Sequence, residues 1–268
     1  MELPILGQGT WRMGEHAAQR GAEVDAIRLG LDLGLKLIDT AEMYASGGSE
    51  AVVGEAVAGR RDQVFIVSKV LPSNASMRGT IAACERSLKQ LRTDHIDLYL
   101  LHWRGGHPLS ETVAGFEQLR AQGKIRHWGV SNFDVADMVE LEALGAGSPC
   151  SANQVYYSLS ERGIEHSLAP WLAERGIPLM AYCPLDEGRL PAHPALAPIA
   201  ARHGATSAQV ALAWLLQRPG TIVIPKSASL ERVEANAAAR ELELDAQDLA
   251  ALDAAFPPPR RKGSLAMV

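Results

Sequence analysis

Eight short apolar segments recur along the chain, and each is followed by a stretch with helical spacing. These segments read LGQGTW, KLIDT, VFIVSK, DLYLLH, HWGVSN, ANQVY, PLMAY and TIVIPKS, and begin near Leu6, Lys36, Val64, Asp97, His127, Ala152, Pro178 and Thr221. Strands that alternate with helices pair in parallel, and eight such units close into a barrel. The sequence therefore predicts an α/β protein with the (β/α)8 (TIM) barrel fold.

Helix starts can be read between these segments. Asp134 and Asp245 each precede a stretch of helical periodicity, where an N-cap residue is expected. Thr206 and Gln209 have the spacing of a capping box, in which each side chain satisfies a backbone N–H of the other residue. The pattern predicts that helices begin at these three places.

No break in composition marks a linker, so we expect one barrel domain over residues 1–268. An open doubly wound sheet is the competing fold, but the Gly7-Gln8-Gly9 loop is too short for a dinucleotide fingerprint. Two regions are expected to be irregular: residues 183–205, which hold four prolines, and the tail from Pro257.

Composition limits the partners and the compartment. The formal net charge of −5 argues against a general nucleic-acid binder. Cys84, Cys150 and Cys183 form neither a disulfide framework nor a zinc pattern, and they fit a reducing cytoplasm. No apolar run approaches the roughly 20 residues that cross a bilayer. We expect a cytoplasmic monomer with no metal, no membrane and no nucleic acid among its partners.

Polar side chains cluster where the apolar segments end. In a barrel these positions converge on one mouth, where catalytic residues lie. The residues concerned are Asp39, Tyr44, Lys69, His102, Ser131, Asn132, Gln154, Tyr182 and Lys226.

Four of these residues suit proton delivery to a carbonyl. Lys69 and Asp39 emerge from apolar segments, where a charge is costly unless it is paired. Tyr44 follows Asp39 by five residues, and an ammonium beside it would favour phenolate and make the hydroxyl a better proton donor. His102 can donate a hydrogen bond to a carbonyl oxygen. The set suits carbonyl reduction.

At these positions the sequence resembles the aldo-keto reductases, and the resemblance runs nearly end to end. Matching blocks are GQGTW, LIDTAEMYASGGSEAVVGEAV, VSKV, DLYLLHW, GKIRHWGVSNF, ANQVYY, AYCPL and IPKSASLERVEAN. The chain looks most like the bacterial branch that includes methylglyoxal reductases. The resemblance implies NADPH-dependent reduction of aldehydes, 2-oxoaldehydes such as methylglyoxal among them, and of some ketones. It makes Asp39, Tyr44, Lys69 and His102 the catalytic residues, with Tyr44 as general acid.

The resemblance also implies how NADPH is held. On the nicotinamide side it implies that Ser131, Asn132 and Gln154 hold the carboxamide and that Tyr182 stacks on the ring. Thr10, Trp11 and Asp39, at neighbouring strand ends, are expected to lie beside the cofactor. On the phosphate side it implies that Cys183, Pro184 and Leu185 cover the pyrophosphate. Lys226, Ser227 and Arg232 are expected to bind the 2′-phosphate, and Asn236 is expected to contact the adenine. Two cations and a hydroxyl suit a dianionic phosphate, which favours NADPH over NADH.

The substrate is expected to meet an apolar wall formed by Trp11 and Trp103, beside Tyr44 and His102. The chain departs from the family pattern at Ala235, where many relatives carry a glutamate. It departs again at Cys183, where serine is usual, and in its short tail, which suggests an open site.

Two other functions compete with reduction. Lys69 could form a Schiff base with a carbonyl substrate, as lysines of barrel aldolases do. A barrel of this family could also serve as a non-catalytic NADPH-sensing subunit. The arrangement of Asp39 and Tyr44 beside the lysine argues against both.

Overall fold

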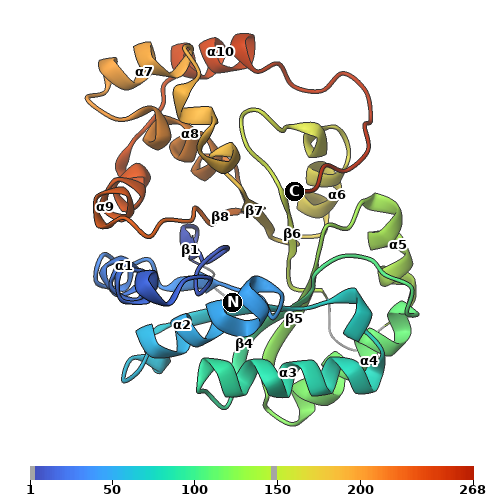
Figure 1. Ribbon diagram of the computed structural model, residues 1–268. Coiled ribbons are helices and arrows are strands. Elements are labelled where there is room, and N and C mark those ends of the chain that lie inside the picture. The colour runs from blue at the N-terminus through green and yellow to red at the C-terminus, as the bar shows by residue number, and fades with distance from the viewer. Residues whose placement is uncertain (1–3, 146–149) are drawn as a thin grey trace.

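The computed structural model describes residues 4–145 and 150–268, in which eight parallel strands form one sheet in sequence order (Figure 1). The strands are β1 (Gly7–Gly9), β2 (Leu37–Asp39), β3 (Phe65–Val70), β4 (Ile96–Leu101), β5 (Ile125–Ser131), β6 (Asn153–Tyr156), β7 (Leu179–Tyr182) and β8 (Thr221–Val223). Each of the eight predicted segments overlaps one of them, with ends that differ by at most two residues at β3, β4 and β5.

The sheet closes between its first and last strands. Leu6 forms a parallel bridge with Val223, and Gly9 forms another with Lys226. The backbone N–H of Val223 donates to the carbonyl oxygen of Ile5 at 2.8 Å. The (β/α)8 barrel predicted from the sequence is therefore confirmed.

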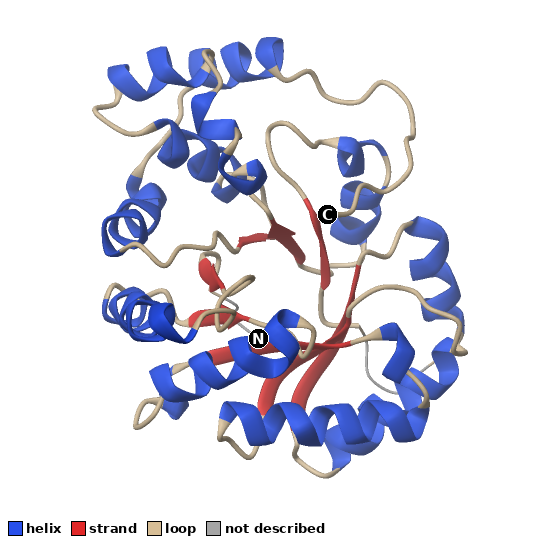
Figure 2. Ribbon diagram, in the orientation of Figure 1, coloured by secondary structure: helices blue, strands red, loops and turns tan. Residues whose placement is uncertain are grey.

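Helices surround the strands, as Figure 2 shows. They are α1 (Arg20–Asp32), α2 (Gly48–Ala56), α3 (Met77–Leu91), α4 (Leu109–Ala121), α5 (Val135–Ala143), α6 (Leu168–Glu174), α7 (Leu196–Arg202), α8 (Ser207–Leu216), α9 (Leu230–Ala238) and α10 (Ala246–Ala255). The three predicted starts are confirmed: Asp134, Thr206 and Asp245 are the N-caps of α5, α8 and α10, each within a capping box.

Apolar side chains fill the inside of the barrel. This inner cluster takes members from five strands and two adjoining residues: Leu37, Val67, Leu98, Leu100, Ala152, Met180, Ile222 and Ile224. A larger apolar cluster lies between the strands and the helices. Because close packing leaves no channel through such a core, polar groups that act together collect at the ends of the strands.

The prediction for residues 183–205 is wrong in part, because this region contains helix α7. Pro198 is the third residue of that helix, where a missing N–H removes no helical hydrogen bond. The segment before α7 has two short 3-10 turns, Asp186–Gly188 and Leu190–Ala192. Residues 257–268 contain no helix or strand, as predicted.

Candidate active site

A cavity of about 900 Å³ opens at the carboxyl ends of the strands. Every residue that the sequence predicted to touch the cofactor lines it, and so do Tyr44 and His102. Lys69 lies beneath the surface with none of its area exposed. Trp103 is absent from the lining, and its ring instead packs against the His102 ring at 4.8 Å. The barrel therefore brings together sixteen of the seventeen distinct residues that were predicted to touch cofactor or substrate, the exception being Trp103.

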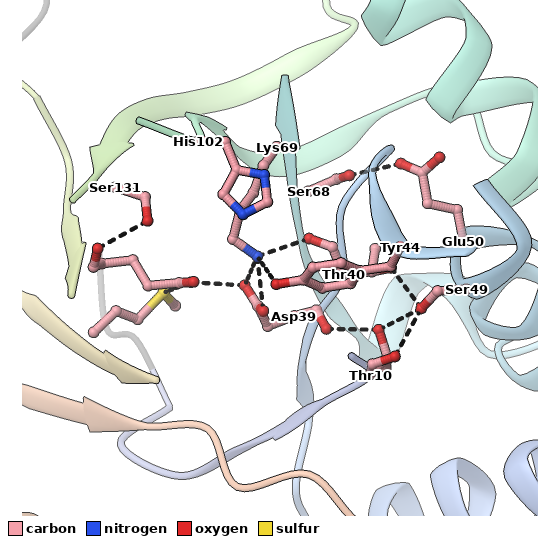
Figure 3. A network of polar contacts seen from close by, with 12 residues as sticks. Thr10, Asp39, Thr40, Tyr44, Ser49, Glu50, Ser68, Lys69, His102 and Ser131 are labelled. Carbon is pink, nitrogen blue, oxygen red and sulfur yellow. Dashed lines mark hydrogen bonds and ion pairs between the residues drawn. The ribbon is translucent and has the colours of Figure 1, made fainter. Parts of the chain in front are cut away.

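At the base of the cavity, Asp39 and Lys69 form a buried ion pair (Figure 3). Asp39 ends β2, and Lys69 is the fifth residue of the neighbouring strand β3. The Lys69 ammonium donates to both carboxylate oxygens at 2.8 Å and to the carbonyl oxygen of Thr40 at 2.9 Å. Burial lowers the pKa of Lys69, and the charge of Asp39 opposes that shift. The carboxylate thus keeps a positive charge in an otherwise dry place.

Tyr44 completes the coordination of this ammonium. Its hydroxyl oxygen lies 3.4 Å from Nζ of Lys69. Burial, and next the negative charge of Asp39, hold the pKa of Tyr44 well above its ordinary value. The expectation that the ammonium makes Tyr44 favour phenolate is therefore wrong, because desolvation and the carboxylate outweigh the ammonium. The phenol therefore carries its proton at neutral pH and can donate it.

His102 lies directly after β4 and faces Tyr44 edge-on, with the two ring centroids 5.9 Å apart. Burial, with a smaller contribution from the charge of Lys69, lowers the pKa of His102 to about 2. The imidazole is therefore neutral across the physiological range. A neutral imidazole has one N–H to donate, so it can hold a carbonyl oxygen beside the Tyr44 hydroxyl.

The wall beside this cluster carries amide and hydroxyl groups from β5, β6 and β7. Gln154 donates from Nε2 to Asp39 at 2.7 Å, and Ser131 donates to the Gln154 carbonyl oxygen at 2.9 Å. The Asn132 amide contacts the His102 carbonyl oxygen at 3.1 Å and accepts from the Tyr182 hydroxyl at 2.9 Å. Donors and acceptors next to an aromatic ring suit a flat heteroaromatic carboxamide.

Positive charge collects at the other end of the cavity. Lys226 follows β8, Arg232 lies in the first turn of α9, and Ser227 lies beside them. Neither cation forms an ion pair with a carboxylate among residues 4–145 and 150–268. Partial burial, together with the nearby charges of Arg12 and Arg232, lowers the pKa of Lys226. Uncompensated cations beside a hydroxyl fit a phosphate dianion, as the expected cofactor requires.

Several further lining residues were missed from the sequence, among them Arg12, Met43 and Glu187. Arg12 and Glu187 lie on opposite loops and form an ion pair at 3.7 Å. Met43 exposes 42% of its surface. Arg12 follows Trp11 and Met43 precedes Tyr44, so their positions next to predicted site residues could have indicated that they line the cavity. Glu187 lies in the turn after β7, where the sequence carries no periodic pattern.

Among residues 4–145 and 150–268, no three side chains of His, Cys, Asp or Glu gather in a way that could hold a metal ion. None of the helices in that part of the chain is both long and apolar enough to cross a membrane.

The fold and the cavity together define a barrel whose mouth joins a buried tyrosine, lysine and aspartate cluster to an end lined by two cations. Comparison with known proteins identifies its family. The sequence model of the aldo/keto reductase family matches residues 5–256. The chain belongs to the aldo/keto reductase family, and the family and enzyme class predicted from the sequence are confirmed.

Individual relatives agree with this assignment. The chain is 53% identical to methylglyoxal reductase YeaE of Escherichia coli, over 100% of this chain and 96% of that protein. A crystal structure of an aldo-keto reductase from Klebsiella pneumoniae in complex with NADPH is 52% identical, with a TM-score of 0.97. The match covers 99% of this chain and 95% of that one. A thermostable aldo-keto reductase, Tm1743, is 36% identical with a TM-score of 0.89, covering 95% and 96% of the two chains.

The neutral state of His102 predicts a dependence of stability on pH. The folded state has a pKa of about 2 at this position, whereas the unfolded chain takes up the proton near pH 6.5. The stabilisation is therefore complete above pH 6.5 and is lost as the pH falls toward 2. Between pH 7.5 and 5, this group should remove about 2 kcal/mol from the free energy of unfolding.

Urea unfolding of the wild type and of His102→Gln at both pH values measures this contribution, since the remaining histidines are common to both proteins. The variant should lose less stability than the wild type by about 2 kcal/mol. Equal losses in the two proteins would show that His102 titrates normally in the folded state.

Proposed function

We propose that this protein reduces aldehydes to alcohols with NADPH, with 2-oxoaldehydes such as methylglyoxal among its substrates, and that it also reduces some ketones. The observation that carries the proposal is a single cavity that joins the Asp39, Lys69, Tyr44 and His102 cluster to the cations Lys226 and Arg232. The relatives named for methylglyoxal reduction and solved with NADPH support it.

NADPH, when bound, supplies a hydride to the carbonyl carbon. The neutral His102 imidazole donates a hydrogen bond that orients the carbonyl oxygen next to the Tyr44 hydroxyl. Tyr44 transfers its proton to that oxygen as negative charge develops there. The Lys69 ammonium, 3.4 Å from the phenol oxygen, then stabilises the phenolate that remains. Asp39 keeps the ammonium charged and in place.

The cofactor would lie along the cavity with its carboxamide on Ser131, Asn132 and Gln154 and its nicotinamide ring against Tyr182. Thr10, Trp11 and Asp39 would lie beside it. The segment Cys183–Leu185 would cover the pyrophosphate, and Cys183 has a positive φ of 48°, which turns the backbone there. At the far end, Lys226, Ser227 and Arg232 would hold the 2′-phosphate, and Asn236 would meet the adenine.

The substrate would sit against Trp11 and Met43, which give the mouth an apolar wall beside Tyr44 and His102. Trp103 would act on this pocket through the His102 ring that it packs against. Val268 also lines the cavity, and Figure 1 shows the tail leading to that position. A small uncharged 2-oxoaldehyde suits such a wall.

We further propose that residues 1–268 act as one domain, as a monomer, in the cytoplasm. The three cysteines, Cys84, Cys150 and Cys183, are unpaired, which suits a reducing compartment.

The competing functions are not favoured. A Schiff-base lysine must reach its substrate, but Lys69 is fully buried and its ammonium is held by Asp39 and Thr40. A purely cofactor-sensing role needs no proton donor, whereas Tyr44 and His102 both line the cavity beside the ion pair.

Tyr44→Phe should lower the turnover number about 10²- to 10⁴-fold, the range expected for the loss of a general acid. The variant removes only the hydroxyl, so NADPH should bind with nearly unchanged affinity. NADPH oxidation with methylglyoxal, alongside fluorescence titration with NADPH, measures both quantities. Wild-type turnover in this variant would contradict the mechanism.

Arg232→Ala should weaken NADPH binding by about tenfold or more, since a charge-assisted contact to phosphate contributes about 1.5–3 kcal/mol. The dissociation constant of NADH, which lacks the 2′-phosphate, should change little. Arg78→Ala, which removes an exposed arginine of α3, is the matched control and should alter neither constant. Equal weakening of NADPH and NADH by Arg232→Ala would overturn the 2′-phosphate assignment.

A further inference from the structure

Tyr44 differs from the other members of the cluster in how the fold holds it. Asp39 and Lys69 belong to strands, and His102 directly follows one, so sheet hydrogen bonds fix their positions. Tyr44 lies in the loop between β2 and α2. Ala45 and Ser46, which follow it, have φ values of 49° and 52°, a left-handed conformation that costs non-glycine residues about 1–2 kcal/mol each. Such a loop keeps its shape only if other contacts hold it.

Glu42, two residues before Tyr44, provides contacts of this kind. Its Oε1 atom accepts from the backbone N–H of Leu71 at 2.8 Å and from Nδ2 of Asn74 at 2.9 Å. Its Oε2 atom accepts from Arg86 of α3 at 3.1 Å. Only 10% of the Glu42 side chain is exposed. The carboxylate therefore ties the Tyr44 loop to the loop that follows β3, the strand of Lys69.

A second attachment lies on the other side of the loop. The Ser49 hydroxyl donates to Thr10 Oγ1 at 2.7 Å and contacts Thr40 Oγ1 at 3.1 Å (Figure 3). These bonds fix the start of the loop and the first turn of α2 to β1. They make no link to the β3 side. In that direction Ser68 of β3 donates to Glu50 of α2 at 2.6 Å and Lys69 donates to the Thr40 carbonyl oxygen at 2.9 Å, so the loop is held at its two ends. Glu42 adds a link from within the loop itself, two residues before Tyr44.

The contact that depends on this link is a long one. At 3.4 Å, the separation of the Tyr44 hydroxyl from Nζ of Lys69 is already near the outer limit of a hydrogen bond. A small shift of the loop away from β3 would break it. Misplacement of a reacting group by about 1 Å can cost about 10²-fold in rate.

We propose that Glu42 is a positioning residue that holds the Tyr44 hydroxyl within reach of Lys69 and of a bound carbonyl. This inference rests on the proposed role of Tyr44 as proton donor. Glu42 itself touches neither the ammonium nor the cavity: the lining includes Met43 and Tyr44 but not Glu42.

The test compares turnover and NADPH affinity in Glu42→Ala and Glu42→Gln, each made in the wild type and in Tyr44→Phe. Glu42→Ala should lower the turnover number about 10- to 100-fold, with NADPH affinity within about twofold of the wild type. Glu42→Gln should stay within about threefold of wild-type turnover, because its amide oxygen can still accept from Leu71 and Asn74.

Glu117→Ala is the matched control. Glu117 is also a partly buried carboxylate, and it accepts from Trp128 Nε1 at 2.7 Å and from Arg120 at 2.8 Å, on α4 and β5. Its loss should lower stability and leave turnover near that of the wild type. If Glu42→Ala fails to fold, Asn74→Ala removes one partner of the same oxygen, and it should lower turnover in the wild type but not in Tyr44→Phe.

The Tyr44→Phe background separates the possible results. If Glu42 acts through the Tyr44 hydroxyl, Glu42→Ala should cause little further loss once that hydroxyl is gone. An equal loss in both backgrounds, or no loss in the wild type, would overturn the inference while leaving the proposed function standing. Wild-type turnover in Tyr44→Phe alone would instead overturn the role of Tyr44 as proton donor, and no NADPH oxidation by the wild type with any aldehyde would overturn the proposed function.

Discussion

The ion pair between Lys69 and Asp39 is the interaction on which the rest of the site depends. Each group alone would be expensive in this position, because Lys69 is fully buried and Asp39 nearly so. Together they give a fixed ammonium that meets the Tyr44 hydroxyl at 3.4 Å. Gln154 binds the same carboxylate, so the amide wall of the cavity and the cluster of Tyr44 and Lys69 are both held by Asp39. The buried ion pair therefore also sets the position of the Tyr44 hydroxyl, which contacts its ammonium.

The barrel makes this pairing possible. Parallel strands β2 and β3 run side by side, with Asp39 opposite Val67, two residues before Lys69. The carboxylate and the longer lysine side chain therefore meet at the same mouth. Apolar residues close the barrel below them, which keeps water away and strengthens every electrostatic contact. The same exclusion of water leaves His102 neutral and Tyr44 protonated, the two states that the proposed proton transfer requires.

The barrel fold and many residues of the cavity could be predicted from the sequence, because they follow from hydrophobic periodicity and from the spacing of motifs. Eight apolar segments predicted the barrel, and the capping residues predicted three helix starts. Residues at strand ends were found because a barrel gathers them. Features that depend on distances between side chains in the folded protein could not be predicted from the sequence. The direction of the Tyr44 pKa shift follows from a balance between burial and two opposite charges. That Trp103 lies outside the cavity lining could not be predicted, because a position next to His102 in the sequence does not set the direction in which the ring packs. The contacts of Glu42 and Glu187 could not be predicted, because both residues lie in loops, where the sequence has no periodic pattern that indicates which side chains are buried.

The most direct measurement is the turnover and NADPH affinity of the double variant Lys69→Met/Asp39→Asn. Removing both charges avoids leaving one of them buried without a partner, so the barrel should remain folded, as circular dichroism and thermal unfolding can verify. If the ion pair sets the position and proton affinity of Tyr44, NADPH should still bind and turnover should fall at least about 100-fold. Turnover close to that of the wild type, in a folded protein that binds NADPH, would contradict the account.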